Sequence, residues 1–283
     1  MIAFLSPALA VYLGLVVFSF AQTAYYSFFK WDGQTAMRFN GLHNFIAMVR
    51  DVEVTSALLH NLVAALMAVA IQVGIAAIIA ILLSRASWGF ATFRAIYFLP
   101  VVVSAVAFAL MWGMFLNPQF GMINTFLRTV GLSNWALEWL SNTHTSLIFA
   151  LLPQTTQGIG WQMLILLAAI AGIPDTLFEA ADLEGIGFFQ RIRHVVIPLI
   201  WEAAQICIVI AVLSSLQGFT HIMVLTGGAP NNATNLAGLV MYKTIFAYSD
   251  FGYGSSIAVV IVLAGLVFSF VFKRYFSIAN VEY

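Results

Sequence analysis

Charged side chains are scarce in this sequence. Only 8% of its 283 residues are Asp, Glu, Lys or Arg, and the formal net charge is zero. A soluble domain is roughly a quarter charged and about half apolar, whereas 62% of this chain is hydrophobic. No soluble core could hide that much apolar surface, so we predict an all-α membrane protein. The zero net charge gives no indication of a nucleic-acid partner.

Residues for metal or nucleotide chemistry are missing as well. Cys207 is the single cysteine, which excludes an internal disulfide, and the five histidines show no paired-ligand spacing. A Gly-x-x-x-x-Gly-Lys-Ser/Thr loop does not occur, so the chain cannot hold nucleotide phosphates in that way. Within the apolar runs there is neither a pair of aspartates nor a His-Glu metal motif. We therefore expect no cofactor and no catalytic residue in this chain.

Long apolar runs are what the sequence has instead. A bilayer core about 30 Å thick needs roughly 20 apolar residues of helix, and a helix satisfies its own backbone in lipid. The first run lacks the basic flank of a signal peptide and is long for one, so we expect a span there. We predict six transmembrane helices, at about 2–22, 61–83, 95–116, 146–172, 199–222 and 256–272. Residues 233–249 ("ATNLAGLVMYKTIFAYS") favour a surface helix along the membrane.

The basic residues closest to the span ends indicate the orientation. With a cytoplasmic N-terminus, the short inner loops carry Arg85, Arg94, Arg191 and Arg193, and Lys273 and Arg274 follow the last span. Lys and Arg in short loops near span ends favour the cytoplasmic side. We predict that both termini are inside.

One inner loop, residues 174–198, combines charge with bulky apolar side chains. Pro174 ends span four, and Thr176 to Glu179 fits a capping box at a helix start. Gly185 suits a C-terminal turn. We predict short helices at about 177–184 and 188–196, with Pro198 at the first position of span five.

A solvated connector is the alternative interpretation of this loop. Exposed apolar residues in so short a loop favour a partner's groove instead. These residues are Leu177, Phe178, Ile186, Phe188 and Phe189.

The stretch "EAADLEGIGFFQRIRHVVIPLI" closely resembles the cytoplasmic "EAA" loop of bacterial ABC importer permeases. In that pattern, Glu-Ala-Ala is followed by three residues, Gly, and a basic stretch that ends in hydrophobic-Pro-Leu. Two further segments, around "VLTGGAPNNATNLAGLVMYKTIFAYSDFGYGSS" and "FNGLHNFIAMVRDVEVTSALLHNLV", are similar to the sugar-permease branch. The resemblance runs from about residue 25 to the end. The basic tail usual before the first span is nearly absent, which suggests a shortened start.

The resemblance implies the type I importer architecture in a bacterial inner membrane. It implies a second, different permease subunit, two cytoplasmic ATPase subunits that bind ATP and Mg²⁺, and an extracytoplasmic solute-binding protein. The solute would be a sugar or oligosaccharide. Glu179 would face the ATPase, and small residues would let the helix sit deep in its groove. The residues implied in coupling are Glu179, Ala180, Ala181, Gly185, Phe188 and Pro198.

Polar side chains within spans four and five suggest where a solute passes. In "PQTTQGIGWQ", Gln154, Gln157, Gly158 and Trp161 share one helical face, as do Ser214, Gln217, Gly218 and His221 in span five. At about 1.5 Å per residue, Gln157 and Ser214 both lie roughly 22 Å from the inner boundary. Amides and hydroxyls with a Trp suit an uncharged polyhydroxylated solute. We predict a pathway lined by Gln154, Gln157, Trp161, Ser214 and Gln217.

The same residues also have purely structural interpretations. Buried amides also bond helices together, and that interpretation is favoured for Gln72, alone in span two. His221 near the outer boundary needs no function. The alternatives to sugar import are import of another neutral polar solute or ion-coupled transport. An ion-coupled transporter would usually show a charged residue at mid-depth, and Glu202 is only one turn into span five.

The predicted turn at Gly185 gives a first test. Replacing Gly185 with Ala should block the turn or the close approach to the ATPase, so less ATPase should co-purify with the permease. Undiminished ATPase binding and transport would contradict this prediction.

Overall fold

The computed structural model describes residues 2–84 and 89–276, with side chains from Ser6 onward. Within these residues the backbone is almost entirely helical. The strands are one antiparallel pair, β1 (Phe29–Lys30) and β2 (Arg38–Phe39), in which Phe29 lies opposite Phe39. Arg85, used above to argue the orientation, lies outside the described residues.

The helices follow one another with few interruptions. The first half contains α1 (Ile2–Tyr12), the π-helical η1 (Leu13–Val17), α2 (Phe18–Tyr26), α3 (His43–Arg50), α4 (Val52–Met67), the π-helical η2 (Ala68–Val73), α5 (Gly74–Leu83), α6 (Phe90–Val102), α7 (Ala105–Phe115), α8 (Met122–Thr129) and the 3₁₀ turn η3 (Ser133–Trp135). The second half contains α9 (Ser146–Ala171), α10 (Asp175–Leu183), α11 (Phe188–Arg191), the π-helical η4 (Ile192–Val196), α12 (Ile197–Leu199), α13 (Trp201–Gln217), α14 (Thr220–Leu225), α15 (Ala237–Phe246) and α16 (Phe251–Phe276).

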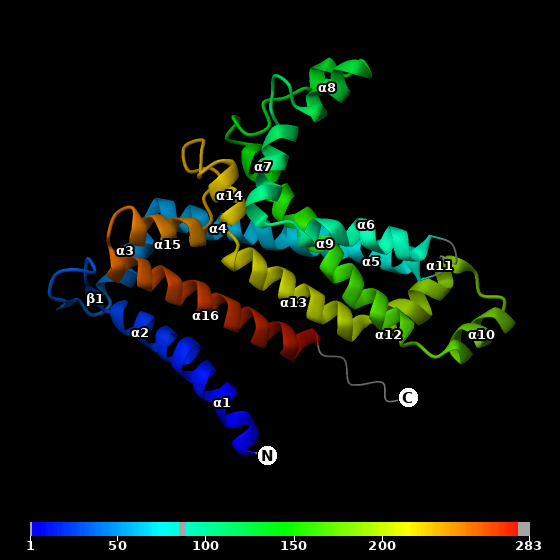
Figure 1. Cartoon of the computed structure of the whole chain (residues 1–283), viewed down its shortest axis with the longest axis horizontal. Coiled ribbons are helices and arrows are strands. Elements are labelled where there is room, and N and C mark those ends of the chain that lie inside the picture. Colours follow the sequence, from blue (N-terminus) through cyan, green and yellow to red (C-terminus); the bar gives the residue numbers. More distant parts are fainter. Residues whose placement is uncertain (1, 85–88, 277–283) are drawn as a thin grey trace.

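Helices lie at all six predicted spans, but only three of them pass as unbroken membrane spans by length and composition. By length and composition, three unbroken helices can cross a membrane: Ser6–Tyr26, Val52–Leu83 and Phe251–Phe276. Three further candidates are helix pairs joined at sharp angles, which brings the total to six if each pair is one span. Figure 1 shows the long helices side by side, with α10 and α11 at one end (the α10 end) and α3 and β1 at the other.

Span three differs most from the prediction of one helix over 95–116. It consists of α6 and α7, which meet at 100°. Pro100 lies inside α6 near its end, and Val103 is extended. Ser104 then caps α7 by accepting a hydrogen bond from the Ala107 amide at 3.2 Å. Proline interrupts the helical bonding and the serine cap starts a new axis. As a result α7 projects sideways from the bundle (Figure 1).

Span five also begins and ends differently from the predicted 199–222. Pro198 belongs to the short α12, and the chain bends by 70° before α13 begins at Trp201, so Pro198 does not start the span. At the other end, Gly218 is extended and separates α13 from α14.

The predicted helices of the inner loop are present with corrected starts. The capping box at Thr176 is wrong: α10 begins at Asp175 after Pro174, without a side-chain cap. The second helix begins at Phe188, as predicted, and continues as helical turns to Leu199.

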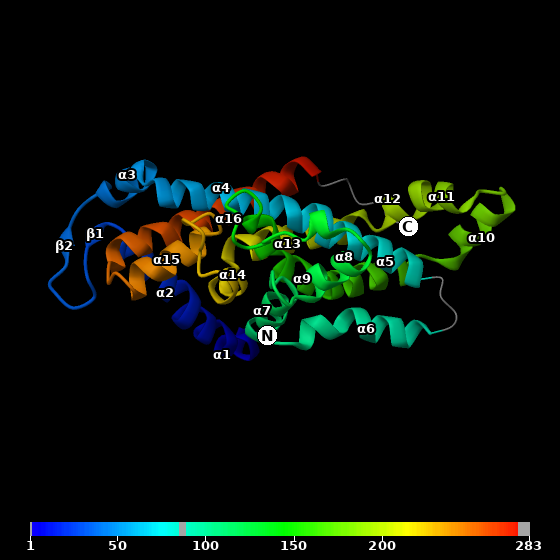
Figure 2. The ribbon, with the colours of Figure 1, turned by 90° about the horizontal axis from the view of Figure 1, so that it is seen from above.

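The surface helix predicted over 233–249 is also wrong. Its counterpart α15 is buried: Ala237, Leu239 and Val240 are at most 4% exposed and pack in the bundle. Figures 1 and 2 both place α15 alongside the start of α16, roughly parallel to the long axis. Its first turn carries almost no polar side chain, which favours the interior over an interface.

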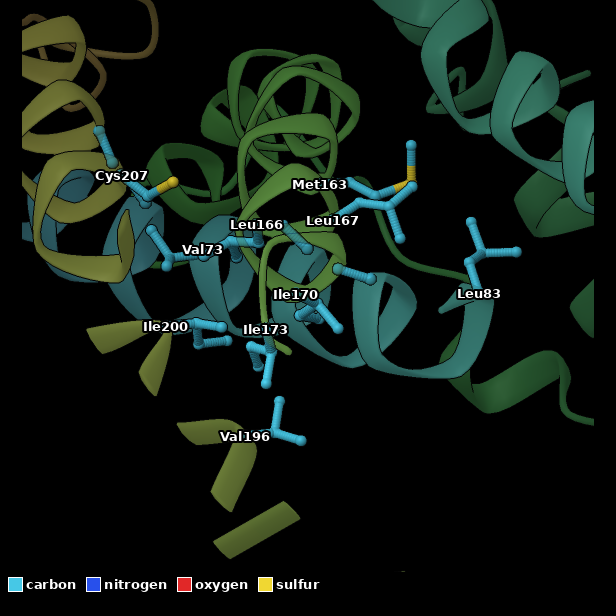
Figure 3. Packing of buried hydrophobic residues seen from close by; sticks show 14 residues of the cluster. Val73, Leu83, Met163, Leu166, Leu167, Ile170, Ile173, Val196, Ile200 and Cys207 are labelled. Atoms are coloured by element: carbon cyan, nitrogen blue, oxygen red, sulfur yellow. The ribbon is translucent and has the colours of Figure 1, made fainter. Parts of the chain in front are cut away.

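A single apolar cluster holds α9 between η2–α5 and α13. Figure 3 shows Leu166, Ile170 and Ile173 of this cluster together with Val196 and Ile200 from the segment that leads into α13. Close-packed side chains transmit displacement rather than absorb it. The inner ends of α9 and α13 therefore form one packed unit.

Asn61 on α4 connects three helices. Its amide nitrogen donates to Ser215 O at 2.8 Å, and its Oδ1 accepts from the Ala237 amide at 2.8 Å. The side chain is 1% exposed. Asn61 thus bonds two backbone groups, a carbonyl left free at the end of α13 and the first amide of α15. Without this side chain, both groups would be unpaired in the interior.

We predict that Asn61→Leu destabilises the detergent-solubilised protein by about 1–3 kcal/mol for each polar group left unpaired. The midpoint of thermal unfolding, followed by tryptophan fluorescence, should fall. Leu62→Ala is the control, because that neighbouring side chain is 58% exposed. Equal melting of both variants would show that Asn61 does not hold these helices together.

Candidate functional site

The loop over residues 174–198, here the coupling segment, forms the α10 end of the molecule (Figure 1). It is continuous with α9 through Ile173 and with α13 through Ile200, both buried in the apolar cluster. The angle between α9 and α10 is 71°. The coupling segment is thus a folded projection attached at both ends to the packed unit.

The outer face of the coupling segment is apolar and acidic. Leu183 is 90% exposed and Phe189 is 81% exposed. Glu179 and Ala180 are also exposed, whereas Ala181 is only 4% exposed. Ala181 therefore contacts its own chain, and the coupling role that the resemblance implies for it stays a prediction. Large exposed apolar side chains next to charge are typical of a protein-binding surface.

Gly185 makes the turn between α10 and α11. Its φ is +69°, in the left-handed region that favours glycine, and a Cβ there would meet nothing within 4 Å. The predicted turn is confirmed, and Gly185→Ala would act through backbone strain rather than through contact within this chain. Across the turn, Asp182 of α10 forms an ion pair with Arg191 of α11.

A polar cavity of about 440 Å³ lies between α9, α13, α14 and the break between α6 and α7. None of the residues that line it is Asp, Glu, Lys or Arg. Trp161 is half-exposed at 51%, so the cavity is open. The lining residues are Gln72, Val101, Val103, Ala105, Gln154, Gln157, Gly158, Trp161, Ser214, Gly218, Thr220 and His221.

Gln157 joins both broken spans. Its Nε2 donates to Pro100 O at 3.0 Å and to Val103 O at 2.8 Å, the carbonyls at the break between α6 and α7. Its Oε1 lies 2.7 Å from His221 Nε2 on α14. Because an amide oxygen only accepts, His221 must carry its proton on Nε2. Every polar group of the Gln157 side chain therefore has a protein partner.

One turn away, Gln154 joins α9 to α13. Its Nε2 donates to Ser214 O at 3.1 Å, while its Oε1 is buried without a partner among the described residues. Gly158 lets a third amide approach, because a Cβ there would collide with the side chain of Gln72. Three amides thus meet around this part of α9.

The predicted meeting of two polar faces is confirmed, with the partners offset by one turn. Gln154, Gln157, Trp161 and Ser214 line one cavity, while Gln217 is not among its lining residues. Whether any of them contacts a solute stays a prediction.

Among the polar lining residues, sequence reasoning missed Thr220 and undervalued Gln72 and His221. Gln72 and Thr220 line the cavity, and His221 is 8% exposed rather than interfacial. The available signal for Gln72 was its isolation as an amide in an apolar span. For Thr220 and His221 the available signal was Gly218 before them, which ends α13 and turns α14 back onto α9.

Solved structures with the same fold exist. The chain aligns with a bacterial ABC transporter involved in the import of the acidic polysaccharide alginate, with a TM-score of 0.83 at 19% identity over 96% of this chain and 93% of that chain. A second structure of an alginate ABC transporter, in complex with an alginate pentasaccharide-bound periplasmic protein, matches equally at 18% identity, 96% and 92% coverage, and TM-score 0.83. At such identities the likeness establishes the fold alone.

Sequence relatives match over nearly their whole length. The chain is 30% identical to the probable ABC transporter permease protein YurN of Bacillus subtilis, over 99% of this chain and 96% of the relative. It is 29% identical to the probable starch degradation products transport system permease protein AmyD of Thermoanaerobacterium thermosulfurigenes, over 94% and 90%.

A family model matches most of the chain, from residue 46 to residue 278. The match includes the coupling segment, both broken spans and every residue that lines the polar cavity. The chain therefore belongs to the family of binding-protein-dependent transport system inner membrane components, the permease subunits of ABC transporters.

Proposed function

We propose that this chain forms half of the membrane pathway of an ATP-driven importer for a neutral sugar or oligosaccharide. One observation carries the proposal: α9 and α13 each bear the coupling segment at one end and line the polar cavity farther along. The apolar cluster packs the two helices together between these sites. A displacement at the inner ends of α9 and α13 therefore reaches the cavity walls through close-packed side chains.

The cavity chemistry supports a neutral, hydroxylated solute. Amide and hydroxyl groups both donate and accept hydrogen bonds, as sugar hydroxyls do. Trp161 offers an exposed ring face on which a sugar ring can stack. A charged solute would need an opposite charge in so apolar a site, and the lining residues supply none. AmyD is described as a permease for starch degradation products, which are neutral sugars of this kind.

Energy must come from a separate polypeptide, because this sequence has no phosphate-binding loop. We assign ATP and Mg²⁺ to two cytoplasmic ATPase subunits that dock on the exposed face of the coupling segment. Leu183 and Phe189 would enter the ATPase groove, with Glu179 at its edge. In this proposal the α10 end faces the cytoplasm.

Two further partners complete the importer. The polar cavity is open, and a second permease subunit, different from this chain, would close it. An extracytoplasmic binding protein would deliver the solute at the α3 end. One structural relative is seen together with its solute-bound periplasmic protein, which supports this arrangement.

The pathway is tested by a pair of matched substitutions, Gln157→Leu and Gln217→Leu. Gln157→Leu removes the three bonds that fix the cavity walls, each worth about 0.5–1.5 kcal/mol, so uptake should fall by about tenfold or more. Gln217→Leu should change uptake by less than about twofold, because that side chain is outside the cavity. The measurement is ATP-dependent uptake of labelled maltodextrin or the cognate sugar into proteoliposomes that contain the complete complex.

Wild-type uptake without ATP would contradict ATP-driven import and favour ion coupling. Equal uptake by both variants would contradict the assigned pathway while leaving the coupling segment untouched.

A further inference from the structure

A second cavity of about 380 Å³, here called the inner cavity, is lined both by the coupling segment and by the inner ends of α5 and α9. It lies between α10 and the membrane helices that α10 would have to move. Leu177 and Phe178 of α10 pack against the apolar cluster beside this cavity, so close packing holds α10 only in part. The lining residues are Ile81, Ser84, Phe90, Leu167, Ile170, Ala171, Ile173, Asp175, Phe178, Phe188, Arg191, Ile192 and Val196.

The turn after α10 is a weak point in the same path. Gly185 has positive φ and Gly187 is extended, with no Cβ to restrict either residue. One backbone bond crosses it, from the Ile186 amide to Ala181 O at 3.0 Å. Backbone rotation at these glycines would therefore let α10 move without moving α11.

The ion pair between Asp182 and Arg191 spans this turn. The Arg191 side chain is 12% exposed, and its Nε is buried without a partner among the described residues, while Asp182 is 63% exposed. A guanidinium so shielded interacts with its carboxylate more strongly than a pair on an open surface. Asp175, the other carboxylate on α10 near Arg191, lines the same inner cavity.

We infer that Arg191 is a positioning residue that locks α10 and α11 into one rigid unit through Asp182. With the lock closed, displacement of α10 reaches α9 through Pro174 and also α13 through α11, η4 and α12. Both walls of the polar cavity then move together. With the lock open, the glycine turn yields, and α13 follows α10 only through its packing against α9. The inference rests on the proposed function for its consequence, although the lock itself is a property of this chain.

The primary variant is Asp182→Asn, which removes the charge at the exposed partner and leaves the fold least disturbed. Asp175→Asn is the matched control, because it makes the same change on the same helix without breaking the pair. Arg191→Lys keeps the cation and should behave close to wild type, whereas Arg191→Gln should reproduce Asp182→Asn.

The first measurement uses the permease alone in nanodiscs. Spin labels at Thr176→Cys and His194→Cys, both exposed, report the distance between α10 and η4 in a Cys207→Ser background. We expect a broader distance distribution in Asp182→Asn and Arg191→Gln, and an unchanged one in Asp175→Asn. A wild-type width in all variants would overturn the lock.

The second measurement uses the reconstituted complex and counts solute molecules imported per ATP hydrolysed. We expect this ratio to fall by roughly fivefold in Asp182→Asn, the factor that corresponds to an ion pair at the upper end of the exposed range. Co-purification of the ATPase should be retained, since Glu179, Leu183 and Phe189, the residues assigned to docking, are unchanged. An unchanged ratio despite a broadened distribution would overturn the positioning role. Failure of the wild-type complex to bind an ATPase would contradict the proposed function instead, and the distance measurement would still judge the lock.

Discussion

The structure depends on one constraint: a helix that breaks inside a membrane leaves carbonyls and amides that water cannot reach. Here carboxamide side chains satisfy them. Gln157 binds the carbonyls freed between α6 and α7, and Asn61 binds one freed at the end of α13 together with the first amide of α15. An amide suits this role because it donates and accepts from one short planar group. Both of these breaks lie where such a side chain is in reach.

These breaks determine the position of the polar cavity. The bend at Ser104 and the extended Gly218 turn α7 and α14 across the bundle axis, and their ends face the continuous α9. The cavity therefore forms where the helix that carries the coupling segment meets the two interrupted spans. Its walls are tied to α9 by side-chain bonds rather than by apolar packing alone. Movement of α9 relative to the bent span three or to α14 must break or stretch the bonds of Gln157.

Much of this arrangement could be predicted from the sequence, because apolar run length and helical spacing are local signals. They gave the six spans, the turn at Gly185 and the shared face of Gln154 and Gln157. The bend at Ser104 was not predictable from hydropathy, since residues on both sides of it are equally apolar. The burial of α15 and the inward position of Ala181 depend on which neighbours pack against them, and no single-sequence pattern contains that information.

The bonding of Gln157 also limits how a solute can be recognised. Its donors and acceptor are all engaged with the protein, so contacts to a solute fall to Gln72, Gln154, Ser214, Thr220 and the ring of Trp161. A few neutral groups and one aromatic face distinguish poorly between sugars of similar size, because discrimination is strong only where a buried polar group would be left unpaired. In the importer proposed here, selection must therefore occur mainly before the solute enters the membrane, at the binding protein. A permissive pathway is then an advantage, since weak contacts let the solute leave toward the cytoplasm once the walls move.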